Sequence, residues 1–248
     1  MTEPATTSGT LLGGRLRFEQ PARGYRVAID PVLLAASVGL ARGRVLDLGA
    51  GAGAAGLCLA WRVPGVAVTA VEIDETLTRL AARNAAANGL ASRLAATTGD
   101  VLRLPRALHG AFDAVVTNPP FETAARASPS PDAARRRAHV EGEATLERWV
   151  RAAHRALKPR GRLFVVHRAD RLGELLAALG PRFGDVEIVA LWPRAGAAAK
   201  RVIVRARRDA RGALVLHPGL VLHEADGRFT AAAERILRDG AALGAGPA

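Results

Sequence analysis

The chain has 248 residues, of which 49% are hydrophobic and 23% charged, which suits one large domain with a full apolar core and short extensions. No apolar run is long enough to cross a bilayer, and residues 1–10 lack the pattern of a secretory signal, so we expect a cytoplasmic protein without membrane contact. The formal charge of +12 favours a polyanionic partner such as nucleic acid, although the dominance of arginine over lysine equally fits a GC-rich genome.

Cysteine and histidine usage gives no sign of a metal. The single Cys58 excludes an internal disulfide and a thiolate cluster, and we expect it to be a small buried side chain. The six histidines show no spacing typical of metal ligands. We therefore expect a protein without a metal. Separately, we expect a monomer.

The segment before the main domain has two parts. Residues 1–10 are polar and small, which predicts a disordered tail. Residues 11–41 predict an N-terminal extension: apolar alternation near residues 11–27 indicates a short antiparallel β piece, and Asp30-Pro31 predicts a helix that runs to about Leu40 with Asp30 as its N-cap.

A glycine-rich stretch follows the first strong strand, residues 44–48. Gly49, Gly51 and Gly53 separate this strand from a helix of small residues, an arrangement that binds nucleotide-like ligands at a helix N-terminus. Asp47 would repel a pyrophosphate but attract the ammonium and sulfonium groups of S-adenosylmethionine. The same glycines also match the dinucleotide fingerprint, so an NAD(P)-dependent oxidoreductase stays open as an alternative.

The rest of the chain alternates strands and helices. Strands are expected at residues 66–72, 94–98, 112–117, 163–166, 186–191 and 202–205, helices at 75–88, 143–157, 168–179 and 231–237, and a late hairpin at 214–222. Residues 122–142 are rich in Pro, Ser and Arg and predict a mobile loop. The pattern indicates a doubly wound, mostly parallel, seven-stranded α/β sheet over residues 42–238, Rossmann-like, followed by a flexible tail at 239–248.

Two further polar residues, Glu72 and Asp100, stand at the ends of predicted strands. Ligands of such sheets bind beyond the carboxyl ends of the strands. Glu72 stands where a carboxylate can accept both ribose hydroxyls of the cofactor. Asp100, with its neighbour Val101, stands where it could receive the amino group of the adenine, although Gly-Asp is also ordinary turn chemistry.

The tetrapeptide Asn118-Pro119-Pro120-Phe121 predicts the chemistry. An exocyclic amine on an aromatic ring, or an amide nitrogen, is a poor nucleophile because its lone pair is delocalised. The Asn118 side-chain oxygen and the Pro119 carbonyl would accept its hydrogens, aim the lone pair at the methyl group and stabilise the developing positive charge. The prolines preorganise these acceptors, and Phe121 offers a face on which an extruded base can stack.

Basic residues gather in three places outside the predicted core, where they could grip phosphates. The three groups are Arg15, Arg17, Arg23 and Arg26; Arg126 and Arg135, Arg136 and Arg137; and Lys200, Arg201, Arg205, Arg207, Arg208 and Arg211.

The glycine loop with Asn118 to Phe121 resembles class I S-adenosylmethionine-dependent methyltransferases that modify amino groups. The frame around it resembles more specifically the bacterial tRNA(Val) adenine-N(6)-methyltransferase family. That likeness is carried by residues 20–35 (QPARGYRVAIDPVLLA), 200–204 (KRVIV) and 220–230 (LVLHEADGRFT).

The resemblance implies an adenosine in the tRNA anticodon loop as the substrate, with Asn118 and Phe121 at the target base. It also implies that Tyr25, Arg26 and Asp30 border the cofactor or base pocket. Three alternatives stay open: methylation of a glutamine amide in a protein, methylation of guanine in rRNA, and a non-catalytic RNA-binding module.

Overall fold

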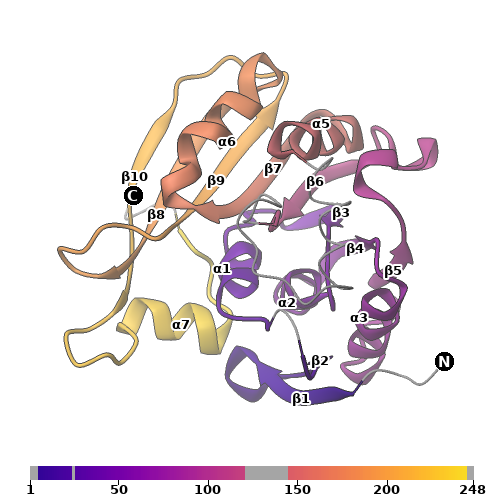
Figure 1. The fold of residues 1–248 in the computed structure, drawn as a ribbon, viewed down its shortest axis with the longest axis horizontal. Coiled ribbons are helices and arrows are strands. Elements are labelled where there is room, and N and C mark those ends of the chain that lie inside the picture. The colour runs from indigo at the N-terminus through magenta and orange to yellow at the C-terminus, as the bar shows by residue number, and fades with distance from the viewer. Residues whose placement is uncertain (1–4, 24–25, 121–144, 245–248) are drawn as a thin grey trace.

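The structure is a computed structural model that describes residues 5–23, 26–120 and 145–244. Its centre is an eight-stranded sheet in the order β10-β8-β9-β7-β6-β3-β4-β5 (Figure 1). The strands are β3 (Arg42–Leu48), β4 (Gly65–Glu72), β5 (Leu94–Thr98), β6 (Phe112–Thr117), β7 (Leu157–Arg168), β8 (Phe183–Arg194), β9 (Arg201–Arg208) and β10 (Val215–His223). Only β9 runs against its neighbours β7 and β8 in this sheet, and the other pairs are parallel.

Helices cover both faces of the sheet and define two cores (Figure 1). One core holds side chains of α1 (Asp30–Ala36), α2 (Ala54–Arg62), α3 (Glu75–Ala87) and α7 (Ala231–Asp239), and the other holds those of α5 (Leu146–Ala156) and α6 (Leu172–Leu179). Along β3, Val45 packs into the first core and Leu46 and Leu48 into the second, as the alternation of strand side chains requires. The doubly wound fold predicted from the sequence is confirmed, and none of the described helices is long and apolar enough to cross a membrane.

The sheet has one strand more than the seven expected. The segment 214–222, predicted as a hairpin, is instead the single strand β10, which pairs in parallel with β8 from Val215↔Glu187 to His223↔Arg194. Pro218 and Gly219 mark a register shift in the middle of β10 rather than a reversal of the chain. Turn residues inside an apolar run fit a bulge as well as a hairpin, which explains the wrong prediction.

Residues 6–10 and 239–243, near the two chain ends, are more ordered than expected. Residues 6–10, predicted as part of a disordered tail, belong to β1 (Thr6–Leu11), which pairs antiparallel with β2 (Leu16–Pro21). At the other end, Leu243 is buried and its N–H donates to the carbonyl of Ala36 over 2.8 Å. The predicted flexible tail from residue 239 is therefore packed against α1 at least as far as Leu243.

Asn84 of α3 and Asn88, the residue that caps the end of this helix, hold the β1–β2 hairpin in place. Asn84 accepts a hydrogen bond from the Glu19 N–H over 2.8 Å and donates to the Glu19 and Ala52 carbonyls, both over 2.9 Å. Asn88 accepts from the Arg17 N–H over 2.9 Å and donates to the Arg17 carbonyl over 2.8 Å. Through Asn84, the hairpin is tied directly to the glycine loop.

Asp30 does not cap α1, contrary to expectation. The helix begins at Asp30, and the preceding Ile29 makes no side-chain cap. The Asp30 carboxylate instead lies 3.1 Å from the guanidinium of Arg201, at the start of β9, with only 12% of its side chain exposed. A charged partner on a neighbouring strand satisfies this partly buried carboxylate better than the free amides of a short helix.

We predict that Asn84→Ala destabilises the fold more than Asn88→Ala. The first substitution leaves three backbone groups without their partner, two of them in the hairpin and one in the glycine loop, and should lower the free energy of unfolding by about 3 kcal/mol. Asn88 is more exposed, so water can replace its bonds and the loss should be about 1 kcal/mol. Urea denaturation of both variants measures the difference, and equal losses would contradict the proposed clamp.

Candidate active site at the carboxyl edge of the sheet

The predicted site residues leave the sheet side by side. Leu48, the last residue of β3, is paired with Val71 of β4 on one side and with Thr117 of β6 on the other. Gly49 and Asn118 therefore follow directly on adjacent parallel strands, which lie about 4.8 Å apart. Glu72, the last residue of β4, is paired with Thr98, the last residue of β5. The segments that follow these two strands therefore leave the sheet at the same edge.

The glycine loop adopts a backbone that only glycine accepts without strain. Gly49, Gly51 and Gly53 have φ values of +73°, +57° and +86°, in the left-handed region. A Cβ on Gly49 would lie 2.6 Å from the ring of Trp149, and one on Gly53 would lie 2.9 Å from the Cβ of Ala81. A Cβ on Gly51 would meet no atom within 4 Å. The loop is therefore closely packed at Gly49 and Gly53, whereas there is open space beside Gly51.

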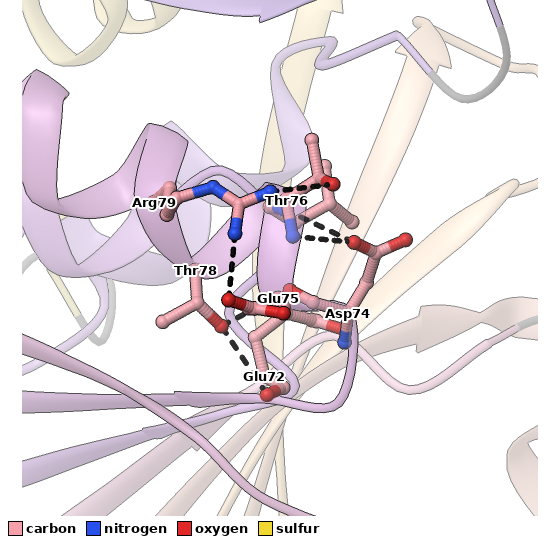
Figure 2. Close-up of polar contacts among 7 residues, drawn as sticks. Glu72, Asp74, Glu75, Thr76, Thr78 and Arg79 are labelled. Carbon is pink, nitrogen blue, oxygen red and sulfur yellow. Dashed lines mark hydrogen bonds and ion pairs between the residues drawn. The ribbon is translucent and has the colours of Figure 1, made fainter. Parts of the chain in front are cut away.

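Glu72 is bound to the open part of this loop. Its Oε2 accepts a hydrogen bond from the Gly51 N–H over 2.8 Å, and its Oε1 accepts one from the Asp74 N–H over 3.1 Å. Figure 2 shows the turn that follows: Asp74 caps α3 by accepting from the Thr76 N–H over 2.7 Å, and the Thr78 hydroxyl donates to the Asp74 carbonyl over 3.0 Å. The capped turn holds the carboxylate of Glu72 against the glycine loop.

Asp47 lies beneath the loop rather than on its surface. It is 2% exposed, and its Oδ2 accepts a hydrogen bond from the Gly56 N–H, in the first turn of α2, over 2.8 Å. Burial is the main cause that raises the pKa of Asp47 to about 7; the Gly56 amide acts against this rise, and the charge of Glu72 contributes to it. A cation at the loop would favour the ionised carboxylate.

Asp100 and Val101 lie next to Glu72. The Gly99 N–H donates to the Glu72 carbonyl over 2.9 Å, and the Oδ1 of Asp100 accepts from the Leu102 N–H over 2.8 Å. Val101 is buried. Asp100 thus lies at the predicted edge of the sheet. Its Oδ1, however, is used in a hydrogen bond within the turn, as expected if Gly99-Asp100 is an ordinary turn.

Asn118 carries an acceptor without a partner. Its Oδ1 is buried and makes no hydrogen bond to any described residue. A buried polar atom left unpaired is costly and rare, and it marks a place where a ligand donor can bind. Pro119 is buried and Pro120 exposed, while Phe121 lies outside the described residues.

The sequence analysis missed two buried polar residues beside this site. Thr117 and Trp149 are hydrogen-bonded to each other over 2.7 Å, and Trp149 also contacts Gly49. A hydroxyl at the end of the apolar run of β6, immediately before Asn118, is the signal that could have found Thr117. Nothing local distinguishes Trp149 from an ordinary core residue on α5.

Two of the predicted substrate-binding residues, Lys200 and Arg201, lie at the same edge but farther along the sheet. Lys200 and Arg201 stand at the start of β9, two strands from β6, which is about 10 Å. Lys200 is exposed, whereas Arg201 is engaged with Asp30. Arg26 is exposed. Tyr25, Arg135, Arg136 and Arg137 lie outside the described residues.

Ion pairs occupy much of the basic group at residues 200–211. Besides Arg201, the paired arginines are Arg205 with Glu187 at 3.3 Å, Arg207 with Asp185 at 3.5 Å and Arg208 with Asp209 at 2.9 Å. The number of basic residues in this segment therefore exceeds the number of cations that can bind a phosphate. Within residues 5–23, 26–120 and 145–244, no group of three or more His, Cys, Asp or Glu side chains could hold a metal ion.

Comparison with known proteins adds independent findings. The family model described as methyltransferase small domain matches residues 30–192. A tRNA1(Val) (adenine(37)-N6)-methyltransferase of Porphyromonas gingivalis is 36% identical over 166 residues, which are 64% of this chain and 64% of that protein. An enzyme with the same description from Dickeya chrysanthemi is 29% identical over 86% of this chain and 87% of its own length.

One solved structure has the same architecture over nearly its whole length. The protein from Agrobacterium tumefaciens, described as a predicted O-methyltransferase, superposes with a TM-score of 0.72 and 29% identity, covering 86% of this chain and 98% of its own.

We predict that the pKa of Asp47 is visible in the pH dependence of stability. Because the pKa rises from 3.8 to about 7, the folded state binds more protons than the unfolded state between these values. The stability of the wild type should therefore fall, relative to that of Asp47→Asn, as the pH rises from 4 to 7. The variant should gain up to about 1.4 kcal/mol per pH unit in this window.

The comparison between the two proteins is needed because His167 titrates in the same window with the opposite sign. Burial lowers the pKa of His167 to about 4, which makes stability rise with pH. Urea unfolding of wild type and Asp47→Asn at several pH values cancels that contribution. Parallel curves would contradict a raised pKa of Asp47.

Proposed function

The chain belongs to the methyltransferase small domain family, and we propose that it transfers the methyl group of S-adenosylmethionine to the 6-amino group of an adenosine in the tRNA anticodon loop. The observation that carries the reaction type is the buried Oδ1 of Asn118 beside the glycine loop, which has no hydrogen-bond partner among the described residues. The activity by which the relatives from Porphyromonas gingivalis and Dickeya chrysanthemi are named supports adenosine in tRNA as the acceptor.

The residues around the glycine loop fit this cofactor. S-adenosylmethionine supplies a methyl group made electrophilic by its attachment to a sulfonium. Gly51 leaves open space at the loop, and the two oxygens of Glu72, now bound to the Gly51 and Asp74 amides, are suited to accept two ribose hydroxyls. The carboxylate of Asp47, beneath the loop, provides the negative charge that favours a cationic ligand.

Asn118 activates the acceptor amine. Its side-chain oxygen and the Pro119 carbonyl accept the two hydrogens of the 6-amino group, which draws the nitrogen out of conjugation and directs its lone pair at the methyl carbon. The same oxygens stabilise the positive charge that reaches the nitrogen during transfer. As the nitrogen–carbon bond forms, the carbon–sulfur bond breaks and the sulfonium leaves as a neutral thioether, S-adenosylhomocysteine. The nitrogen then releases one proton to water, which restores the neutral methylated amine.

The exposed Lys200 and Arg26 contact the RNA backbone in this proposal. Lys200 precedes β9 at the edge where β6 ends, so a tRNA whose base enters at Asn118 would pass over it. Because such contacts neutralise phosphates, they contribute affinity without sequence preference. A tRNA substrate would place this activity in the cytoplasm.

The direct test is methyl transfer in vitro. The protein is incubated with S-adenosylmethionine carrying a labelled methyl group and with unmodified tRNA, and the digested nucleosides are separated by mass spectrometry. We expect labelled N6-methyladenosine. Label in guanosine of rRNA, or in a protein glutamine, would overturn the proposed acceptor, and tighter calorimetric binding of NADP than of S-adenosylmethionine would overturn the cofactor.

We predict that Asn118→Ala lowers turnover by about 10²–10³-fold, because it removes one acceptor that acts on the developing charge. The dissociation constant of S-adenosylmethionine should stay near the wild-type value. Asn88→Ala, which removes an asparagine remote from the reaction, is the matched control and should keep its turnover. A fully active Asn118→Ala enzyme would contradict this role.

We predict that Lys200→Ala weakens tRNA binding about equally for all sequences and reduces the slope of log affinity against log salt by about 1. The control is Arg42→Ala, an exposed arginine at the start of β3 and thus at the opposite edge of the sheet, which should leave the slope unchanged. Filter binding at several salt concentrations measures both. The same slope for Lys200→Ala and wild type would exclude a phosphate contact at Lys200.

A further inference from the structure

The hydroxyl of Thr117 connects three elements at the site. Its Oγ1 donates a hydrogen bond to the Leu48 carbonyl over 2.7 Å and accepts one from the Nε1–H of Trp149 over 2.7 Å. Thr117 is 1% exposed and Trp149 6%, so water does not compete for these bonds. The chain Trp149–Thr117–Leu48 thus joins α5, β6 and β3.

These hydrogen bonds lie directly beside the two loops that form the site. Leu48 immediately precedes Gly49, and Thr117 immediately precedes Asn118. The pairing of β3 with β6 ends at Leu48↔Thr117, and the side-chain bond adds one further link just before the two loops separate. A hydroxyl has one proton to donate, so accepting from Trp149 leaves that proton directed at Leu48.

Trp149 also supports the glycine loop from below. Its ring lies so close to Gly49 that a Cβ on that glycine would be 2.6 Å from the ring carbon Cζ2. Gly49 has a φ of +73°, and its N–H and that of Ala50 donate to the Val71 carbonyl over 2.9 Å and 3.0 Å. The Trp149 indole therefore both packs against the glycine loop at Gly49 and fixes the orientation of the Thr117 hydroxyl.

We propose that Thr117 and Trp149 are positioning residues that set the separation between the cofactor loop and the acceptor oxygen of Asn118. The inference rests on the proposed function, because it assigns these residues to methyl transfer across that gap. Methyl transfer needs the nitrogen, carbon and sulfur in line, and a displacement of 1 Å can cost about 10²-fold in rate. A link at the base of both loops controls this distance without touching either reactant.

The first experiment separates positioning from mere packing. Thr117→Val keeps the size of the side chain but removes both hydrogen bonds, whereas Thr117→Ser restores the hydroxyl. We expect Thr117→Val to lower kcat by about 10²-fold with dissociation constants for S-adenosylmethionine and tRNA within about threefold of wild type, and Thr117→Ser to recover most of the loss. If both variants lose kcat equally, or if the loss lies in binding alone, the proposal is wrong.

Thr230→Val is the matched control for this series. The Thr230 hydroxyl also donates to a strand carbonyl, that of Val221 over 2.7 Å, and accepts an N–H, that of Ala233 over 3.1 Å, but it lies at the start of α7. The variant should lose stability comparably while its kcat stays at the wild-type value. An equal loss of kcat in Thr230→Val would attribute the effect to general destabilisation.

Trp149→Phe tests the second link. The smaller ring still packs in the core but donates no hydrogen bond, so kcat should fall, and the double variant with Thr117→Val should be no slower than Thr117→Val alone, because one chain is broken twice. Trp192→Phe removes a comparable indole bond, to the Pro218 carbonyl at 3.0 Å, and should leave kcat unchanged. Additive losses would contradict a single chain.

A measurement without RNA or turnover distinguishes failure of this proposal from failure of the proposed function. The side-chain amide resonances of Asn118 in ¹⁵N-labelled protein, assigned with Asn118→Asp, should broaden or split in Thr117→Val and stay sharp in Thr230→Val. If tRNA is not methylated but the resonances change in this way, the proposed function fails and the positioning link stands. If they do not change in Thr117→Val, the link is overturned whatever the substrate is.

Discussion

The parallel pairing of β3 with β6 is the constraint on which the site depends. It fixes Leu48 opposite Thr117, so that a loop of glycines and a loop of prolines start from neighbouring strands at one height. A slip of one residue would turn Leu46 and Leu48 out of the second core, and they are fully buried there. Burial of ordinary leucines therefore determines where Gly49 and Asn118 meet.

Arginine plays a largely internal part in this strongly basic chain. Arg62 donates to the carbonyl of Ala35, in the last turn of α1, and to that of Val38, just beyond the helix, and Arg205 donates to the Leu243 carbonyl. Arg201 holds Asp30 across the carboxyl edge. A planar guanidinium with several donors suits such carbonyl clusters. The net charge of +12 is thus a poor measure of the cations available to a polyanion.

The sequence predicted the first half of the sheet well because β4 and β6 are apolar runs bounded by clear turn residues. It predicted the ends of these strands, at Glu72 and at Thr117 just before Asn118, for the same reason. It failed at β10, because Pro218 and Gly219 permit a bulge as well as a turn, and at Asp30, whose distant partner Arg201 no local pattern reveals. Thr117 and Trp149 were missed because a hydrogen bond between residues 32 apart leaves no periodic trace.

The hydrogen bonds from Asn84 and Asn88 to β2 affect which substitutions the β1–β2 hairpin tolerates. Four residues of helix rise about 6.0 Å, and two residues of strand span about 6.6 Å, so Asn84 and Asn88 meet alternate residues of β2. Their bonds reach only the main chain of Glu19 and Arg17, and main chain is the same for every amino acid except proline. A substitution at position 17 or 19 by any residue except proline therefore leaves these bonds in place, and the hairpin keeps its position beside the glycine loop.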